Sequence, residues 1–139
     1  MKFRFIEAHM RVAYIYANLS YCVRRKVGCV IVKDDKIISI GYNGTPSGFS
    51  NTCETEDGKS TLPITIHAEL NAITKLAKSH ESGNGASLFV TTAPCQQCAI
   101  TILQSGITNV YYCEDYRGVT DGVDFLRKAG IKVLQVSLE

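Results

Sequence analysis

The sequence predicts an α/β fold, a three-layer α/β/α sandwich around a five-stranded mixed sheet. Apolar residues recur at three- and four-residue spacing in four segments, as on one face of a helix, and five short runs are rich in β-branched residues, as in strands. After the first two runs, strands alternate with helices, which favours crossover connections and parallel strands. The 139 residues fit one domain, spanning 1–139.

The first part of the chain predicts a helix followed by a hairpin and a loop. Helical spacing joins seven residues that we expect on the core-facing side of this helix: Phe5, Ala8, His9, Val12, Ile15, Tyr16 and Leu19. The apolar runs 29–32 and 37–40 flank a polar connection of hairpin length and should pair antiparallel. Residues 45–63 are polar and rich in breakers, which predicts a long loop.

The second part predicts three helices and three strands. Helical spacing covers 67–78, 95–104 and 122–129, and strand patterns cover 87–91, 109–113 and 132–136. Gly106 and Gly130 follow the last two helical segments, where a left-handed capping residue is commonly needed.

Composition and charge exclude several classes of protein. With 45% hydrophobic and 20% charged residues, the chain has the composition of a folded domain. A formal charge of +2 gives too weak a field to gather a long polyanion, so extended nucleic acid is not expected as a partner. No apolar run reaches the roughly 18 residues of a membrane span, and the first seven residues lack the apolar region of a signal peptide. We therefore expect a cytoplasmic protein without a membrane partner, whose six cysteines stay reduced as ligands or buried apolar residues.

Two short motifs combine the side chains of a catalytic zinc site. His67 lies two residues before Glu69, and Pro94 precedes Cys95 and Cys98. A catalytic zinc takes three protein ligands and leaves its fourth position to water, and one histidine with two cysteines is a suitable set. Glu69 can reach that water as a proton shuttle without being a ligand. Taken singly, the cysteines could also be a redox pair or half of a structural zinc site, and His67 an ordinary polar residue at a helix start.

His-x-Glu followed by Pro-Cys-x-x-Cys is the signature of zinc deaminases. On these motifs the sequence resembles the cytidine and deoxycytidylate deaminase superfamily, and most of all its deoxycytidylate (dCMP) deaminases, over nearly the whole chain. The similar stretches are 20–24, 27–32, 41–48, 67–73, 90–91 and 94–99.

The resemblance implies a cytidine deaminase-like fold with one catalytic Zn²⁺ and Glu69 as the catalytic residue. It implies hydrolysis of dCMP to dUMP and ammonia, which supplies dUMP for thymidylate synthesis. It further implies a homo-oligomer, often a hexamer, activated by dCTP and inhibited by dTTP, with Mg²⁺ accompanying the dCTP effector.

Candidate substrate residues lie in three places. Arg24 and Lys26 belong to a short basic cluster that suits one phosphate group, although such a cluster can equally be a solvated turn. Asn43 offers a donor and an acceptor to a sugar hydroxyl or the base edge, although Asn43-Gly44 can also be an ordinary turn. The backbone N–H groups of Ala68 and Cys95, at helix starts, could hold the pyrimidine carbonyl and the oxygen at the metal.

The resemblance also assigns an effector site and a doubtful second metal. The candidate effector residues are Gly41, Tyr42, Asn43 and Gly44. Some longer relatives carry a second zinc near the positions of Cys22 and Cys53, with help from histidines, but residues 54–66 contain none here. We therefore expect Cys22 and Cys53 to be buried thiols or an incomplete site. Cys29 and Cys113 are expected in the core, and His9 and His80 are assigned no chemistry.

Two other functions remain open from the sequence. One is a deaminase acting on another cytosine nucleotide, or on a base in tRNA or single-stranded nucleic acid, which should have a basic groove with stacking aromatics. The other is a nucleotide-binding regulatory module in which zinc is only structural.

Overall fold

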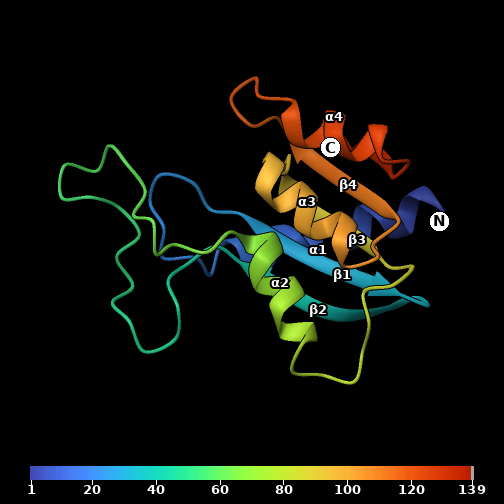
Figure 1. Ribbon diagram of the computed structural model, residues 1–139, viewed down its shortest axis with the longest axis horizontal. Helices are drawn as coiled ribbons and strands as arrows, with labels where there is room; N and C mark the ends of the chain where they lie inside the picture. The colour runs from blue at the N-terminus through green and yellow to red at the C-terminus, as the bar shows by residue number, and fades with distance from the viewer. Residues whose placement is uncertain (139) are drawn as a thin grey trace.

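The computed structural model describes residues 1–138 and contains a five-stranded mixed sheet between two layers of helices (Figure 1). The strand order is β2-β1-β3-β4-β5. The elements are α1 (Phe3–Ala17), β1 (Gly28–Lys33), β2 (Lys36–Tyr42), α2 (Ala68–Leu76), β3 (Ser87–Thr92), α3 (Gln96–Gln104), β4 (Asn109–Glu114), α4 (Asp121–Lys128) and β5 (Lys132–Gln135). This arrangement confirms the predicted fold class and every predicted helix and strand, with ends shifted by a few residues.

The sheet is antiparallel at one side and parallel at the other. β1 pairs antiparallel with β2 and β3, whereas β3, β4 and β5 run parallel. Asp34 and Asp35 both have positive φ in the turn between β1 and β2, which is the turn geometry that matches the twist of a hairpin. The parallel strands β3 and β4 end together at Thr92 and Glu114, and ligand sites of α/β folds lie beyond such carboxyl ends.

Each face of the sheet has its own hydrophobic core. Helices α2, α3 and α4 cover one face, where Ala72, Ile102 and Leu126 are fully buried against Leu88 and Val110. Helix α1 covers the opposite face, and Figure 1 shows it behind the sheet. The two motifs predicted to bind metal both lie on the three-helix face, at the starts of α2 and α3.

The prediction of which side of α1 faces the core is wrong. Phe5, Ile15 and Leu19 are 45%, 63% and 53% exposed, and the buried residues are Ile6, Met10, Ala13 and Ala17. The helix approaches β1 so closely that a Cβ on Gly28 would collide with the backbone of Ala13 and Ala17. Small residues must therefore face the sheet there, and several bulky ones lie outside.

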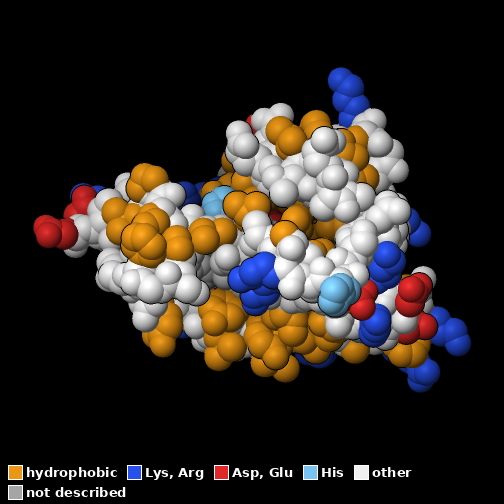
Figure 2. Space-filling view, turned by 60° about the horizontal axis from the view of Figure 1, so that its bottom comes forward, with side chains coloured by type: hydrophobic (Ala, Val, Ile, Leu, Met, Phe, Trp, Pro, Cys, Tyr) orange, Lys and Arg blue, Asp and Glu red, His pale blue; other side chains and the backbone are white. Residues whose placement is uncertain are grey.

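Residues 43–67 form the predicted long loop, which projects at the left of Figure 1. Figure 2 shows hydrophobic side chains gathered on this projection, and Phe49 and Ile64 are exposed there. Cys53 forms a disulfide with Cys22, and the Cα atoms of the two residues are 5.2 Å apart. The expectation that all six cysteines are free is thus wrong for this pair, because the fold brings the two chain segments within disulfide reach. No helix within residues 1–138 is long and apolar enough to cross a membrane.

Candidate metal and nucleotide site

The three predicted ligands meet where two helices begin. His67 directly precedes α2, Cys95 directly precedes α3, and Cys98 lies in the first turn of α3. The Nδ1 atom of His67 is 3.3 Å from Cys98 Sγ and 3.5 Å from Cys95 Sγ. All three potential ligand atoms lie within 4.8 Å of one another.

This geometry fits zinc. Tetrahedral zinc with ordinary zinc–sulfur and zinc–nitrogen bond lengths holds such nitrogen and sulfur atoms about 3.6 Å apart, close to both observed distances. The donors are also of the types zinc prefers, and three ligands leave a fourth position open. The residues present therefore fit one zinc ion of the catalytic kind.

The surroundings favour the ligand form of Cys95. Hydrogen bonding from Cys98 and from His67 lowers the pKa of Cys95 to about 4. Its position at the start of α3 adds the positive end of the helix dipole. Cys95 is therefore a thiolate at neutral pH, which is the form that binds metal.

Among residues 1–138, Glu69 is the one buried acid, and it lies beside the candidate ligands. It lies in the first turn of α2 and is only 4% exposed. Burial raises the pKa of Glu69 to about 7, against the opposing effects of its own backbone hydrogen bond and of His67. A carboxyl group with this pKa can both accept and release a proton near neutral pH.

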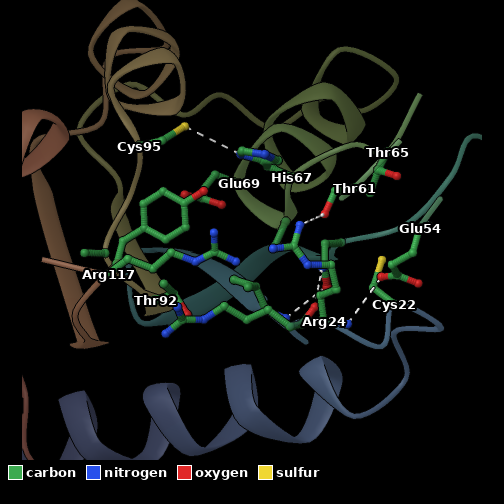
Figure 3. A pocket seen from close by; sticks show the side chains of 16 residues that line it. Cys22, Arg24, Glu54, Thr61, Thr65, His67, Glu69, Thr92, Cys95 and Arg117 are labelled. Carbon is green, nitrogen blue, oxygen red and sulfur yellow. Dashed lines mark hydrogen bonds between the residues drawn. The ribbon is translucent and has the colours of Figure 1, made fainter. Parts of the chain in front are cut away.

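A pocket opens directly beside Glu69 and His67. Five segments line it: the end of the connection between α1 and β1, the long loop, the start of α2, the end of β3, and the residues after β4. Three arginines, Arg24, Arg25 and Arg117, contribute to its walls. In Figure 3 Arg24 and Arg117 extend toward the middle of the pocket from opposite walls, below Glu69. The pocket thus joins a buried acid and a cluster of possible metal ligands to a cationic region.

Thr92 also lines this pocket, at the end of β3. Its side chain is buried, and its hydroxyl has no hydrogen-bond partner within residues 1–138. An unpaired buried hydroxyl costs free energy, so such groups are uncommon away from functional sites.

The sequence prediction missed Tyr116 and Arg117. They lie in a tight turn after β4, in which Tyr116 bridges to Val119 while Arg117 and Gly118 have positive φ. A signal was present, because Tyr-Arg-Gly follows a strand that is parallel to the strand leading into Pro94-Cys95. Residues after neighbouring parallel strands meet at one edge of the sheet.

The predicted substrate residues are placed unequally. Arg24 and Ala68 line the pocket, but Lys26 is exposed and lies outside its lining. Asn43 reaches the pocket, yet its side-chain oxygen accepts a hydrogen bond from the Val27 backbone and its NH₂ group donates one to Arg25 O. The amide therefore shapes the wall made by residues 25–27 and retains only one donor and one acceptor site for a ligand.

The predicted effector residues are also divided. Tyr42, Asn43 and Gly44 line a second cavity of about 210 Å³ together with residues of the adjoining loop. Gly41 does not, because it is buried against α2, where a Cβ would collide with the backbone of Ala68 and Ala72. The need for glycine at position 41 comes from this close packing of strand against helix.

A second group of possible metal ligands consists of Cys22, Cys53 and Glu54. The two sulfurs are joined in a disulfide, so they have no thiolate to offer a metal. Cys29 is fully buried as expected, and Cys113 is half-buried.

The fold and the site together define a class of protein. A three-residue His/Cys/Cys cluster that fits zinc lies beside a buried acid at the end of a pocket in an α/β fold. This arrangement is that of zinc-dependent deaminases. Residues 4–114 match the family described as the cytidine and deoxycytidylate deaminase zinc-binding region. The chain belongs to this family.

Several proteins similar to this chain are named members of the same family. Deoxycytidylate deaminase of Saccharomyces cerevisiae is 36% identical over 136 residues; the match covers 92% of this chain but only 43% of the yeast protein. The enzyme of the same name from Enterobacteria phage T4 is 35% identical, with 91% of this chain and 87% of the phage protein covered. The crystal structure of dCMP deaminase from cyanophage S-TIM5, in complex with dCMP and dUMP, is 47% identical with a TM-score of 0.94 and covers 98% of this chain and 99% of that one.

Proposed function

We propose that this protein catalyses the hydrolytic deamination of dCMP to dUMP and ammonia, and so supplies dUMP for thymidylate synthesis. The observation that supports this most is one pocket with the His67 ligand cluster and Glu69 at one end and three arginines in its walls. Deamination of a cytosine ring needs a zinc site with an acid beside it, and arginines in the walls suit the single phosphate of a nucleotide. The relatives named dCMP deaminases support the same substrate.

The residues have separate roles in the proposed reaction. When bound by His67, Cys95 and Cys98, zinc supplies the Lewis acidity that activates a water molecule. Glu69 takes the two protons of the attacking water in turn and delivers one to the ring nitrogen and one to the departing ammonia, as its near-neutral pKa allows. The backbone N–H of Ala68 lies at the start of α2, where it can hold the pyrimidine carbonyl.

The phosphate would be bound by Arg24 and Arg117. The guanidinium of Arg24 has one long hydrogen bond, 3.4 Å to Thr61, so it is little used by the protein itself. Arg117 makes no hydrogen bond or ion pair within residues 1–138 and only lies over the ring of Tyr116. Both can therefore turn their donors toward an anion, whereas Lys26 is placed outside the pocket.

A base in a long nucleic acid is a less suitable substrate. Only three cationic side chains, Arg24, Arg25 and Arg117, line the pocket within residues 1–138, and Glu54 of the long loop lines it with them. A formal charge of +2 provides no extended basic track for a polynucleotide.

We also propose the finer properties that the family resemblance suggests, control by dCTP and dTTP and assembly into a homo-oligomer such as a hexamer. The second cavity beside Gly44 would take the effector. Its lining within one chain has no charged side chain, so charges for a triphosphate, and any Mg²⁺ with it, would have to come with the ligand or from a neighbouring copy. The exposed Phe5, Ile15 and Leu19 offer apolar surface for such a neighbour.

Ammonia release from cytidine, deoxycytidine, dCMP and dCTP by the zinc-loaded protein tests the proposal. We expect dCMP to have the highest kcat/KM. Arg117→Ala should raise KM for dCMP but not for deoxycytidine, and Lys26→Ala serves as the matched cationic control. Equal turnover of dCMP and deoxycytidine by the unchanged protein would contradict the assignment of the phosphate.

A further inference from the structure

A chain of contacts runs from helix α1 to the nucleotide pocket on the other side of the sheet. The hydroxyl of Tyr14 donates a 2.6 Å hydrogen bond to Oε2 of Glu114, the last residue of β4. The other carboxylate oxygen, Oε1, lies 3.5 Å from Nη2 of Arg25. The same Nη2 donates a 3.1 Å hydrogen bond to the carbonyl oxygen of Asp115. Three side chains thus connect α1 to the start of the turn that bears Arg117.

Arg25 differs from the other two arginines of the pocket in its partners. Its polar contacts are with Glu114 and with the backbone of Asp115, and its guanidinium lies 6.0 Å from the centre of the Tyr116 ring. All of these groups belong to the end of β4 and the turn after it. The guanidinium of Arg117 lies over the same ring, also at 6.0 Å. Arg25 is therefore engaged with the protein, while Arg117 keeps its donors available.

The turn needs such an anchor. Residues 117–120 are exposed, so no hydrophobic core fixes them, and Arg117 has a positive φ of 52°, which an L-residue adopts at a cost. Within the turn, the N–H of Val119 donates to Tyr116 O at 2.8 Å. By contrast, α1 is fixed to the sheet by Met10 and Ala13, both fully buried. Tyr14 therefore provides a rigid end for the chain of contacts.

Tyr14 remains a hydrogen-bond donor over the whole neutral range. Burial and the hydrogen bond to Glu114 both raise the pKa of Tyr14 above its usual value. The carboxylate of Glu114 can therefore use one oxygen for this hydroxyl and the other for Arg25.

We propose that Tyr14 and Glu114 are positioning residues for the phosphate subsite: they hold Arg25 as a strut, and Arg25 fixes the turn that presents Arg117 to the nucleotide. This inference rests on the proposed function for its substrate, but the contacts themselves do not. Arg25 is accordingly a support and not a phosphate ligand.

The test combines kinetics with amide hydrogen exchange on the zinc-loaded protein. Tyr14→Phe removes one hydroxyl and keeps the ring, and Tyr16→Phe on the same helix is the matched control, because the Tyr16 hydroxyl makes no hydrogen bond within residues 1–138. For Tyr14→Phe we expect KM for dCMP to rise roughly three- to tenfold, the effect of one hydrogen bond to a charged group at a partly exposed site, with kcat within about twofold. Deoxycytidine, which has no phosphate, should show unchanged kcat/KM.

Arg117→Ala supplies the second half of a double-mutant cycle. In that background Tyr14→Phe should change KM by less than about twofold, since the group it positions is gone. An equal rise of KM in both backgrounds would overturn the proposal, because a purely structural effect of Tyr14 would not depend on Arg117.

Amide exchange separates this inference from the proposed function. Tyr14→Phe and Glu114→Gln should both accelerate exchange of the Val119 amide, and Tyr16→Phe should not. Unchanged exchange at Val119 would refute the strut even if dCMP is the substrate. Failure of the unchanged protein to release ammonia from dCMP would instead refute the proposed function, while faster exchange in the two variants would still support the strut.

Discussion

Gly122→Ala should damage the metal site although Gly122 is not a ligand. Gly122 lies in the first turn of α4 and packs on the turn that begins α3. A Cβ there would be 2.8 Å from both the carbonyl carbon and the carbonyl oxygen of Cys95, and nearer still to Pro94 O. Relieving these contacts requires a shift of roughly 0.5 to 1 Å between α4 and the ligand-bearing turn.

The size of the effect of Gly122→Ala depends on how far helix α3 and the zinc ligands can move. Cys95 O accepts the first hydrogen bond of α3, from Ala99 N at 2.9 Å, so the turn cannot move without straining that helix. Metal–ligand distances tolerate only about 0.2 Å. We therefore expect the free energy of unfolding to fall by about 1 to 3 kcal/mol, the usual cost of overpacking. Misplacing Cys95 should also weaken zinc binding by about 10- to 100-fold and lower kcat by up to roughly 100-fold.

Three measurements check this prediction: urea unfolding, zinc competition with a chelator and ammonia release from dCMP. Gly44→Ala is the control for the first two, because a Cβ at Gly44 meets nothing within 4 Å. If Gly122→Ala bound zinc as tightly as the unchanged protein while Gly44→Ala behaved normally, the argument that α4 supports the Cys95 turn would be refuted.

Three further predictions concern single side chains. Glu69→Gln should keep zinc and lose about 10²- to 10⁴-fold in kcat, whereas Cys95→Ala should lose both zinc and activity. Metal analysis combined with a turnover assay distinguishes the two variants. Normal turnover by Glu69→Gln would exclude proton transfer by this residue. Thr92→Val replaces a buried, unpaired hydroxyl with a methyl group and should raise the free energy of unfolding by about 1 kcal/mol in the absence of nucleotide; a lower stability in urea unfolding would mean that the hydroxyl has a partner. Burial lowers the pKa of His9, against the opposing effect of Asp35, so the unfolded chain binds more protons and stability should fall as the pH drops below about 6.5. His9→Gln should reduce this loss between pH 7.5 and 5.5, and an identical pH dependence in both proteins would contradict the assignment.

The choice of buried face on α1 shows where sequence periodicity is ambiguous. Apolar residues lie on two sides of this helix, and the bulkier side was predicted to face the core. The structure buries Ile6, Met10, Ala13 and Ala17, because the helix backbone approaches Gly28 of the neighbouring strand. Only knowledge of that neighbour distinguishes a close-packed small-residue face from an exposed bulky one.

The cationic side of the pocket shows a similar limit. Arg24, Arg25 and Lys26 are consecutive and look equivalent in sequence, yet Arg24 faces the pocket, Arg25 contacts Glu114 and Lys26 is exposed. Arg117, more than 90 residues away, lines the same pocket as Arg24. Residues after parallel strands are brought together by the sheet, and their side-chain directions are set by turn geometry that the residue types alone do not specify.

The sequence by itself determined the fold class and the order of helices and strands, and it singled out His67, Cys95, Cys98 and Glu69, which the fold brings close together. These follow from local patterns, because helix and strand periodicity and ligand spacing at helix starts act over a few residues. Only the tertiary structure decided which arginines share the pocket, that Cys22 meets Cys53, and that Tyr14 supports the opposite side of the sheet through Glu114. These contacts join residues 31 to 100 positions apart, and their formation depends on the packing of whole layers, which no short segment encodes.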